Sequence, residues 1–395
     1  MKKNEIFKNY DEYILSTYTR TPGIFVKGKG MDLIDINGKK FLDFFPGWGV
    51  NNVGHCHPKV MAGVRDQISK LIHIPNNFYH PNQVKLAKEI IRCSFPGKVF
   101  FANSGTEACE AAIKFSRIYG RPSGRYEIIT MKNSFHGRTL GSLAATGQTK
   151  YQEGFGPLPE GFNCVPFNDM AALKAAVSDK TVAIMLEPVQ GEGGVNIADK
   201  NYITQIRELC DQKDVLMIFD EVQTGMGRTG AMFAFEHYHV KPDLMLLAKA
   251  LGGGLPIGAL VVKKPIASTF QPGMHASTFG GSPLVCKAAL GAFKAIAADK
   301  MLKNTKTMGI YILNKLEKFK GKFNCIKDVR GLGLMIGIEL NIEGKAIYED
   351  CFENGLIINC TQGNILRLMP ALNVTRKQAN KALLILEKAF EKITK

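Results

Sequence analysis

Short apolar runs alternate with helical stretches through the middle of the chain, from residue 98 to residue 262. Runs of about five apolar residues, separated by helical segments, are typical of buried strands in a parallel sheet. The pattern predicts strands over residues 99–101, 127–130, 182–186, 215–219 and 243–247, and helices that include residues 107–117 and 201–212. We therefore expect an α/β fold with a mostly parallel central sheet flanked by helices.

The pattern changes after Gly281, where a long helical stretch begins. A basic amphipathic helix follows, with apolar residues on one face: Ile312, Leu316, Phe319 and Phe323. Residues 331–340 alternate with glycine like a strand, and a final helix begins near Thr375. These elements predict a second, smaller α+β domain.

The first part of the chain contains a hairpin-like piece over residues 31–45, which turns at Asn37-Gly38. We expect this piece to pack with the C-terminal part of the chain. The predicted organisation is an N-terminal segment that packs with the small domain, a large domain, and a C-terminal small domain, over residues 1–55, 56–290 and 291–395.

The composition is that of an ordinary folded protein, with 395 residues, 45% apolar and 22% charged. The longest nearly uncharged apolar stretch, residues 251–262, is interrupted by glycines and a proline. It is also shorter than the roughly 20 residues that a membrane helix needs. Glu5 and Asp11 stand where a signal peptide would need its apolar core. We expect no membrane partner and a cytoplasmic location.

The cysteines and histidines do not predict a metal site. The nine cysteines are scattered, with no C-x-x-C pair and no zinc-ribbon spacing. His55-Cys56-His57 could suggest a metal, but no third ligand lies at a recognisable spacing and Pro58 marks a turn. We interpret this segment as a structured loop.

The one unusual total is the charge, because 51 Lys and Arg against 35 Asp and Glu give a net +16. Such an excess could serve nucleic acid, an anionic membrane surface or acidic small molecules. Residues 301–330 supply 8 − 2 = +6 and residues 376–395 supply 6 − 2 = +4, on helices whose opposite faces are apolar. We interpret them as solvated outer helices. No RNP, helix-turn-helix or zinc-finger pattern indicates a nucleic-acid partner.

An acid and a lysine follow two predicted strands. Residues 215–219 lead to Asp220, and residues 243–247 lead through Ala248 to Lys249. Ligands in α/β sheets lie beyond the carboxyl ends of the strands. A lysine at such a place is partly desolvated, which lowers its pKa and suits Schiff-base chemistry. A lone lysine is more often an ordinary surface residue, so further features are needed.

Two segments supply them. Ser104-Gly105-Thr106 stands between a predicted strand and the helix from Glu107, where free N–H groups and the helix dipole suit a phosphate. Residues 134–139 follow another strand and bring Phe135 and Arg138 to the same sheet edge.

A different reading starts from Gly225 to Gly230, which fit G-x-G-x-x-G and would suggest an NAD-dependent dehydrogenase. Residues 220–224 separate these glycines from the strand, however, and residues 231–239 continue poorly as a helix on a pyrophosphate. We keep this alternative as the less favoured one.

Taken together, these residues resemble the class III (ornithine-type) aminotransferases of the type I pyridoxal-phosphate fold. The resemblance covers most of the chain, and the block from Asp220 to Gly254 is most similar to the members that act on acetylornithine. Its other motifs include Gly54-His55-Cys56-His57-Pro58, Glu187-Pro188-Val189-Gln190-Gly191-Glu192-Gly193-Gly194, Ser277-Thr278-Phe279-Gly280-Gly281, and Arg367 before Pro370. It implies pyridoxal 5′-phosphate as cofactor and a homodimer with active sites at the subunit interface.

The resemblance also implies roles at the cofactor. Lys249 would hold it covalently and move a proton during the transfer. Asp220 would pair with the ring nitrogen, and the partner subunit's Thr278 would complete the phosphate site. The implied cofactor-binding residues are Ser104, Gly105, Thr106, Phe135, Asp220, Glu221, Val222, Gln223, Lys249 and Thr278.

For substrates, the resemblance implies that Arg138 takes the carboxylate remote from the reacting amine and that Ser277 contacts the substrate. Glu192 and Arg367 match a switch pair. The glutamate masks the arginine while the amine donor reacts, then releases it to bind the α-carboxylate of 2-oxoglutarate or glutamate.

The expected reaction moves the terminal amino group of N2-acetyl-L-ornithine to 2-oxoglutarate, giving N-acetylglutamate 5-semialdehyde and glutamate in arginine biosynthesis. Ornithine, succinylornithine, succinyl-diaminopimelate, carrier-linked lysine and 4-aminobutyrate remain alternative donors. Trp48 and Tyr79 are expected pocket walls, and Trp48 stands where ornithine-converting members have a tyrosine. Ala276, Phe279 and Ser282 replace the usual Gly, Tyr and Asn of the family.

Overall fold

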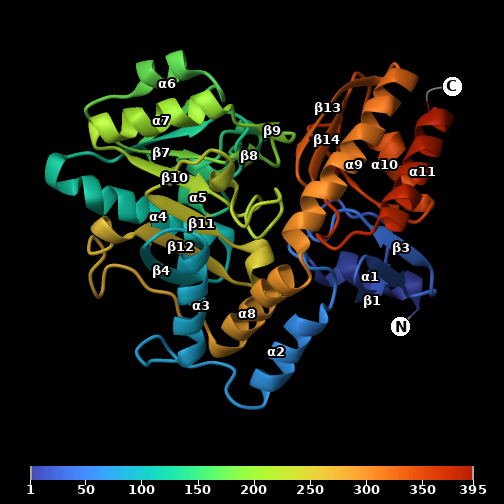
Figure 1. The fold of residues 1–395 in the computed structure, drawn as a ribbon, viewed down its shortest axis with the longest axis horizontal. Coiled ribbons are helices and arrows are strands. Elements are labelled where there is room, and N and C mark those ends of the chain that lie inside the picture. The colour runs from blue at the N-terminus through green and yellow to red at the C-terminus, as the bar shows by residue number, and fades with distance from the viewer. Residues whose placement is uncertain (1, 394–395) are drawn as a thin grey trace.

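The computed structural model describes residues 2–393, and its central element is a seven-stranded sheet (Figure 1). The strands, in spatial order, are β4 (Gly97–Ala102), β12 (Gly258–Lys263), β11 (Leu244–Leu247), β10 (Leu216–Asp220), β7 (Thr181–Leu186), β5 (Glu127–Met131) and β6 (Phe162–Val165). Neighbours from β11 to β6 are parallel, and β12 alone runs antiparallel to both of its neighbours. The predicted mostly parallel sheet is confirmed, whereas β12 and β6 were not predicted.

Helices cover both faces of this sheet, whose central strands β7, β10 and β11 are apolar apart from Thr181 and Asp220 at their ends. Leu216 and Ile218 of β10 pack in one core with α4 (Gly105–Gly120). Met217 and Phe219 point to the opposite face and share a core with α7 (Lys200–Lys213). Successive side chains of a strand alternate between faces, so a continuous apolar run is required where both faces are covered.

The remaining helices surround these layers. Five further helices lie between residues 58 and 298: α2 (Pro58–Ile68), α3 (Pro81–Cys93), α5 (Leu140–Ala145), α6 (Met170–Ala176) and α8 (Pro283–Ala298). The strands β8 (Val189–Gln190) and β9 (Asn196–Ile197) form a small two-stranded sheet. Of these helices, α2 and α3 both pack on α8. Among the described helices, none is both long enough and apolar enough to cross a membrane.

The C-terminal part forms its own antiparallel sheet, which lies at the right of Figure 1. Its strands are β13 (Ile326–Leu332), β14 (Met335–Leu340), β17 (Ile365–Leu368) and β16 (Asn359–Thr361), and its helices are α9 (Met301–Lys322), α10 (Lys345–Glu353) and α11 (Arg376–Ile393). The strand predicted over residues 331–340 is confirmed from Met335 to Leu340, but residues 331 and 332 belong to a separate strand, β13. The chain reverses there at Gly333, which has φ 60° and lies so close to Thr229 that a Cβ would collide with its backbone at 2.4 Å.

The predicted helix face is correct up to Phe319, because Ile312, Leu316 and Phe319 are buried in α9. Phe323 lies just beyond the end of that helix, where it stacks on Phe390 of α11 with ring centroids 5.2 Å apart. The aromatic ring is therefore buried by α11 although its backbone is no longer helical.

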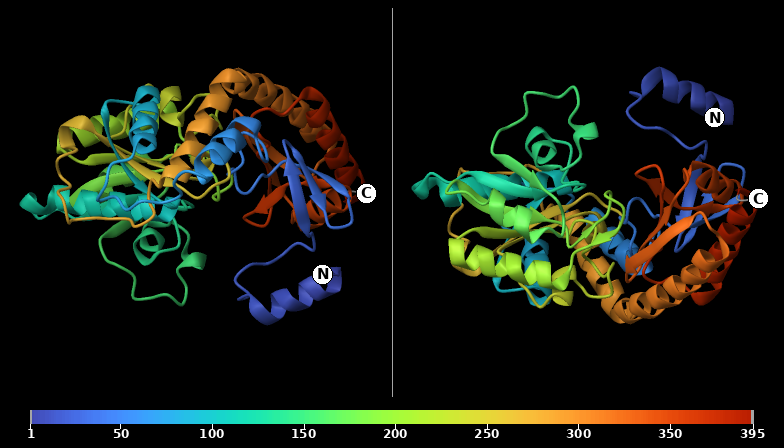
Figure 2. Two further views of the ribbon diagram at one scale, coloured as in Figure 1. Left: turned by 90° about the horizontal axis from the view of Figure 1, so that it is seen from below. Right: turned by 90° about the horizontal axis from the view of Figure 1, so that it is seen from above.

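The N-terminal hairpin contributes to a third sheet, of β1 (Phe25–Lys29), β2 (Asp32–Asp35), β3 (Lys40–Asp43) and β15 (Leu356–Ile357). Strand β3 pairs in parallel with β15, and this pairing joins the N-terminal segment to the C-terminal part of the chain. Before this sheet, α1 (Lys3–Tyr13) has no buried residue and stands away from the body in Figure 2. The domain boundaries at residues 55 and 290 stay predictions.

The pairing of β3 with β15 predicts a matched pair of leucine substitutions. Leu356 in β15 is fully buried, whereas Leu384 in α11 is 53% exposed. Leu356→Ala is expected to lower the free energy of unfolding by about 2–5 kcal/mol, because it leaves a cavity in the core. Leu384→Ala is expected to change it by no more than about 0.5 kcal/mol. Urea unfolding of both variants measures the difference, and equal effects would contradict the packing described.

Candidate active site

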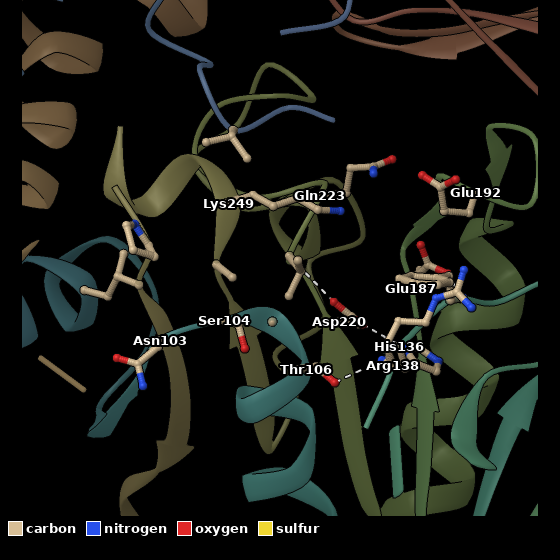
Figure 3. A pocket seen from close by; sticks show the side chains of 18 of the residues that line it. Asn103, Ser104, Thr106, His136, Arg138, Glu187, Glu192, Asp220, Gln223 and Lys249 are labelled. Carbon is tan, nitrogen blue, oxygen red and sulfur yellow. Dashed lines mark hydrogen bonds and ion pairs between the residues drawn. The ribbon is translucent and has the colours of Figure 1, made fainter. Parts of the chain in front are cut away.

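A cavity of about 480 Å³ lies at the carboxyl ends of β10 and β11, beside the N-terminus of α4. In an open α/β sheet this is the usual place for a ligand. Figure 3 shows Asp220, His136 and Arg138 on one side of the cavity and Asn103 and Ser104 on the other. The residues of the sequence prediction that line it are Ser104, Gly105, Thr106, Phe135, Arg138, Glu192, Asp220, Val222, Gln223 and Lys249.

Lys249 follows β11 after one residue and begins the short 3-10 turn η4 (Lys249–Gly252). Its φ of 45° lies in the left-handed region, which costs a non-glycine residue about 1–3 kcal/mol. Burial lowers the pKa of the Lys249 amino group, against the opposing effect of the Glu192 and Asp220 carboxylates. Lys249 is half-buried, and its amino group holds a proton less tightly than that of a surface lysine.

Asp220 ends β10 and is bonded to a histidine that the sequence analysis did not assign. The His136 Nδ1 atom lies 2.7 Å from Asp220 Oδ2, and the Val222 amide donates to Asp220 Oδ1 at 3.0 Å. Burial lowers the pKa of His136, but the hydrogen bond and charge of Asp220 outweigh it, and the net shift is upward. His136 Nε2 is buried without a partner among the described residues. The sequence feature that could have identified His136 is its position between Phe135 and Arg138, in a loop that follows a strand.

Glu187 lies beside this pair and is held by the main chain. Its carboxyl accepts hydrogen bonds from the Phe135 amide at 3.0 Å and the Gly191 amide at 3.1 Å. Burial raises the pKa of Glu187 to about 7, although the nearby His136 opposes this. Glu187 therefore fixes the loop that presents Phe135 to the cavity.

The N-terminus of α4 forms the anion-binding end of the cavity. Ser104 caps the helix, and its hydroxyl accepts a hydrogen bond from the Glu107 amide at 3.3 Å. The first amides of a helix, here those of Gly105 and Thr106, have no carbonyl partner within the helix. The 134–139 loop approaches so closely that a Cβ on Gly137 would stand 2.2 Å from Thr106 Oγ1. Only glycine fits at this contact.

Arg138 extends from the same loop over two aromatic rings. Its guanidinium lies 4.2 Å from the centroid of Tyr151 and 5.6 Å from that of Phe135. Arg138 is exposed, and cation–π contacts of this kind orient a guanidinium without neutralising it, so the side chain is available to bind an anion. Tyr151 was not predicted, because it lies in a separate turn.

Arg367 of β17 is fully buried and pairs with Glu192, whose Oε1 lies 2.9 Å from Arg367 Nη1. Its Nε donates to Asn359 Oδ1 at 2.8 Å, and the Phe45 ring lies 4.9 Å from the guanidinium. Nη2 has no partner among the described residues. Burial raises the pKa of Glu192, but the charges of Arg367 and Lys249 outweigh it and the net shift is downward. The pair is ionised, with one guanidinium nitrogen unused.

Gln223 and Glu221 differ in position although they are close in sequence. Gln223 lines the cavity, and its Oε1 lies 3.5 Å from Arg367 Nη1. The Glu221 carboxylate points elsewhere. It accepts hydrogen bonds at 2.8 Å from the amides of Ala234 and Phe235 and from the Thr224 hydroxyl. Glu221 is therefore bonded to a neighbouring turn and is not on the cavity wall.

Ser277 and Thr278 line a different cavity of this chain. The Ser277 hydroxyl accepts a hydrogen bond from Asn103 Nδ2 at 3.3 Å, which links it to the edge of the main cavity. Thr278 is exposed. Trp48 and Tyr79 are 50% and 100% exposed and are not among the residues on the main cavity wall, where Val50 is the residue from the N-terminal segment.

The two other motifs have structural explanations. Gly225 to Gly230 form a loop that leads to the 3-10 turn η3 (Ala234–His237), not to a helix that could face a pyrophosphate. Arg228 in this loop is fully buried and donates to the carbonyls of Leu334 and Pro370. His55 and His57 are bonded to separate carboxylates, Asp43 at 2.7 Å and Asp299 at 3.0 Å.

This chain is similar to known proteins in sequence and in structure. The family model described as "Aminotransferase class-III" matches residues 14–390. Acetylornithine aminotransferase of Methanocaldococcus jannaschii is 53% identical over 97% of this chain and 97% of the relative. The protein of that name from Caldanaerobacter subterraneus is 48% identical over 97% and 98%.

Solved structures agree with this similarity. The ornithine aminotransferase from Toxoplasma gondii superposes with a TM-score of 0.96 at 31% identity, over 100% of this chain and 96% of that one. The acetylornithine aminotransferase from Elizabethkingia anophelis gives 0.89 at 31% identity, over 99% and 100%.

The buried Glu221 carboxyl predicts a pH-dependent stability. Burial raises its pKa from 4.5 to about 7, so the folded chain binds a proton there that the unfolded chain releases. Stability from this group is present below pH 4.5 and is lost as the pH rises through about 7. Relative to Glu221→Gln, the wild type is expected to lose up to about 3 kcal/mol of unfolding free energy over this window.

Urea titrations at several pH values between these limits measure that difference. Glu317→Gln, which alters an exposed carboxyl on α9, is the matched control. Stability curves of wild type and Glu221→Gln that run parallel across the window would show that the carboxyl has no raised pKa.

Proposed function

The chain belongs to the class III aminotransferases, and from this premise we propose that it transfers the terminal amino group of N2-acetyl-L-ornithine to 2-oxoglutarate. The family match over residues 14–390 and the superpositions confirm the expected type I fold and an aminotransferase that depends on pyridoxal 5′-phosphate. The donor is proposed from relatives that bear the name acetylornithine aminotransferase and are 53% and 48% identical over nearly the full length.

The proposal rests on Lys249, which lines the same cavity as the bonded pair of Asp220 and His136. The residues present fit the cofactor. The open amides at the start of α4 suit its phosphate, and Gly137 lets the 134–139 loop approach Thr106 beside these amides, where a Cβ would collide. Asp220 suits its ring nitrogen, because a carboxylate bonded to one histidine still has lone pairs to offer. Phe135 offers a ring face at the same wall.

When bound, pyridoxal phosphate supplies an electron-accepting ring and the carbonyl group through which an amino group is exchanged. Lys249 would then move the proton to and from the substrate carbon that bears the reacting amine, which its lowered pKa favours. Asp220 would pair with the ring nitrogen and keep it protonated, and His136 would orient the Asp220 carboxylate through the 2.7 Å contact between Nδ1 and Oδ2.

The two arginines match the charges of the two substrates. Acetylornithine carries one carboxylate, which Arg138 would bind, whereas 2-oxoglutarate and glutamate carry two. The second carboxylate requires Arg367, which has a free Nη2 and gains Nη1 when Glu192 leaves it. A charge that is masked for one substrate and exposed for the other lets a single cavity serve both.

A homodimer completes the proposal. Thr278 is exposed and lies outside the cavity that Ser104 to Thr106 line, so the phosphate site of each subunit would use the partner subunit's Thr278. Large apolar side chains are exposed in the same region, with Phe78 and Phe279 each 62% exposed and Tyr79 fully so. Contiguous exposed aromatic residues mark an interaction surface. The cytoplasmic location stays a prediction.

The purified protein is expected to be yellow from bound pyridoxal phosphate and to form glutamate from 2-oxoglutarate with N2-acetylornithine faster than with free ornithine. A donor panel with the succinylated donors and 4-aminobutyrate measures the preference. Free ornithine as the better donor would instead favour the reaction in the name of the Toxoplasma gondii structure.

Lys249→Ala is expected to abolish both the colour and the turnover while the thermal unfolding midpoint remains that of a folded protein. Lys264→Ala, which removes an exposed lysine just after β12, is the matched control and is expected to keep both. Retained turnover in Lys249→Ala would refute the assignment of Lys249.

A further inference from the structure

The loop that carries Glu192 is poorly fixed by its own sequence. Glu192 lies between Gly191 and Gly193-Gly194, in the turn that joins β8 to β9. Glycine has the largest conformational freedom of any residue. A glutamate that must meet a buried arginine at 2.9 Å therefore needs an external support.

That support comes from the hairpin of β16 and β17, which also carries Arg367. The Glu192 carbonyl accepts hydrogen bonds from the Thr361 hydroxyl at 2.8 Å and from Gln362 Nε2 at 2.7 Å. Gln362 Nε2 also donates to Gln148 Oε1 at 3.0 Å, and Lys150 Nζ donates to Gln362 Oε1 at 3.2 Å. The hairpin thus holds the main chain of the glutamate on the same element that holds the arginine.

The backbone conformation at Gln362 indicates that glutamine occupies this position because of the contacts of its side chain and not because it suits the turn. Gln362 has φ 53° and Gly363 has φ 80°. Successive positive φ values at a hairpin turn favour Asn-Gly, because asparagine tolerates the left-handed region. Glutamine is a less favourable residue for the turn, but its longer side chain spans the gap to the Glu192 carbonyl.

We propose that Gln362, together with Thr361, is a positioning residue that fixes the main chain of Glu192 opposite Arg367 and so sets the balance between the two substrates. This inference rests on the proposed function and deepens it. With the Glu192 carbonyl held, exchange between the masked and exposed arginine needs only a rotation of the glutamate side chain. Without the hold, the loop moves, Glu192 pairs less often with Arg367, and the arginine captures the donor carboxylate unproductively.

The test compares the two half-reactions in Gln362→Asn, which suits the turn better but is one methylene shorter. The ratio of kcat/KM for acetylornithine to kcat/KM for glutamate is expected to fall about fivefold, the effect of losing one such hydrogen bond. The thermal unfolding midpoint is expected to stay equal or to rise. Thr361→Val, which removes the hydroxyl, is also expected to lower this ratio. Thr361→Ser, which keeps a hydroxyl, is expected to leave the ratio at the wild-type value.

Hydrogen exchange over residues 189–196, followed by mass spectrometry on the holoenzyme, gives a readout that does not depend on activity. Exchange there is expected to be faster in Gln362→Asn than in wild type, while β17 is unchanged. Lys300→Asn is the matched control, because Lys300 is also left-handed, with φ 52°, but is exposed at the start of α9.

The outcomes separate the two proposals. A wild type that does not use acetylornithine refutes the proposed donor, and the exchange experiment still tests the hold on Glu192. Unchanged exchange in Gln362→Asn, or two half-reactions that fall by the same factor, would overturn the positioning role.

Discussion

The guanidinium of Arg367 is the point at which the separate parts of this chain meet. Glu192 comes from the loop after β8, Gln223 from the loop after β10, Asn359 from β16 and Phe45 from the N-terminal segment, and all of them contact it. A buried cation is costly unless it is paired and hydrogen-bonded. The large sheet, the C-terminal sheet and the N-terminal segment must therefore be placed correctly together for this one charge to be accommodated.

The same constraint explains why the site can be both stable and changeable. The Nε side of Arg367 is fixed by Asn359 and the ring face by Phe45, so the guanidinium keeps its orientation when Glu192 leaves. Its Nη2 atom has no partner among the described residues and presents a ready donor. Asp220 ends β10 and Lys249 follows β11 after one residue, so two neighbouring parallel strands fix the spacing of their backbones. The rigid sheet thus positions the reacting groups, whereas a side chain on a glycine-rich loop selects between the substrates.

Much of this could be read from the sequence, for a physical reason. Parallel strands buried on both faces are apolar throughout, so the runs that end at Asp220 and Lys249 were recognisable, and parallel strands bring their carboxyl ends to one edge. The helix start at Ser104 was recognisable from its capping residues. The resemblance then indicated roles for Arg138, Glu192 and Arg367, which periodicity could not.

What the sequence did not reveal depends on contacts between distant segments. Asn359 and Gln362 act on Arg367 and Glu192 across the hairpin and across a loop, and no local pattern marks them. The chain reverses at Gly333, where only glycine fits because Thr229 approaches closely from a part of the chain more than 100 residues earlier. Glu221 follows Asp220 directly, yet its side chain leaves the cavity wall because the turn at Ala234 and Phe235 offers it two amides.

We propose that the charge of Glu192 masks Arg367 for a donor with one carboxylate and that Glu192 yields the arginine to a substrate with two. The most direct measurement is single-turnover kinetics of the two half-reactions in Glu192→Gln. The acetylornithine half-reaction is expected to slow at least about tenfold, the effect of losing a charged hydrogen-bond partner, while the glutamate half-reaction changes by no more than about twofold. Equal slowing of both half-reactions would contradict the claim.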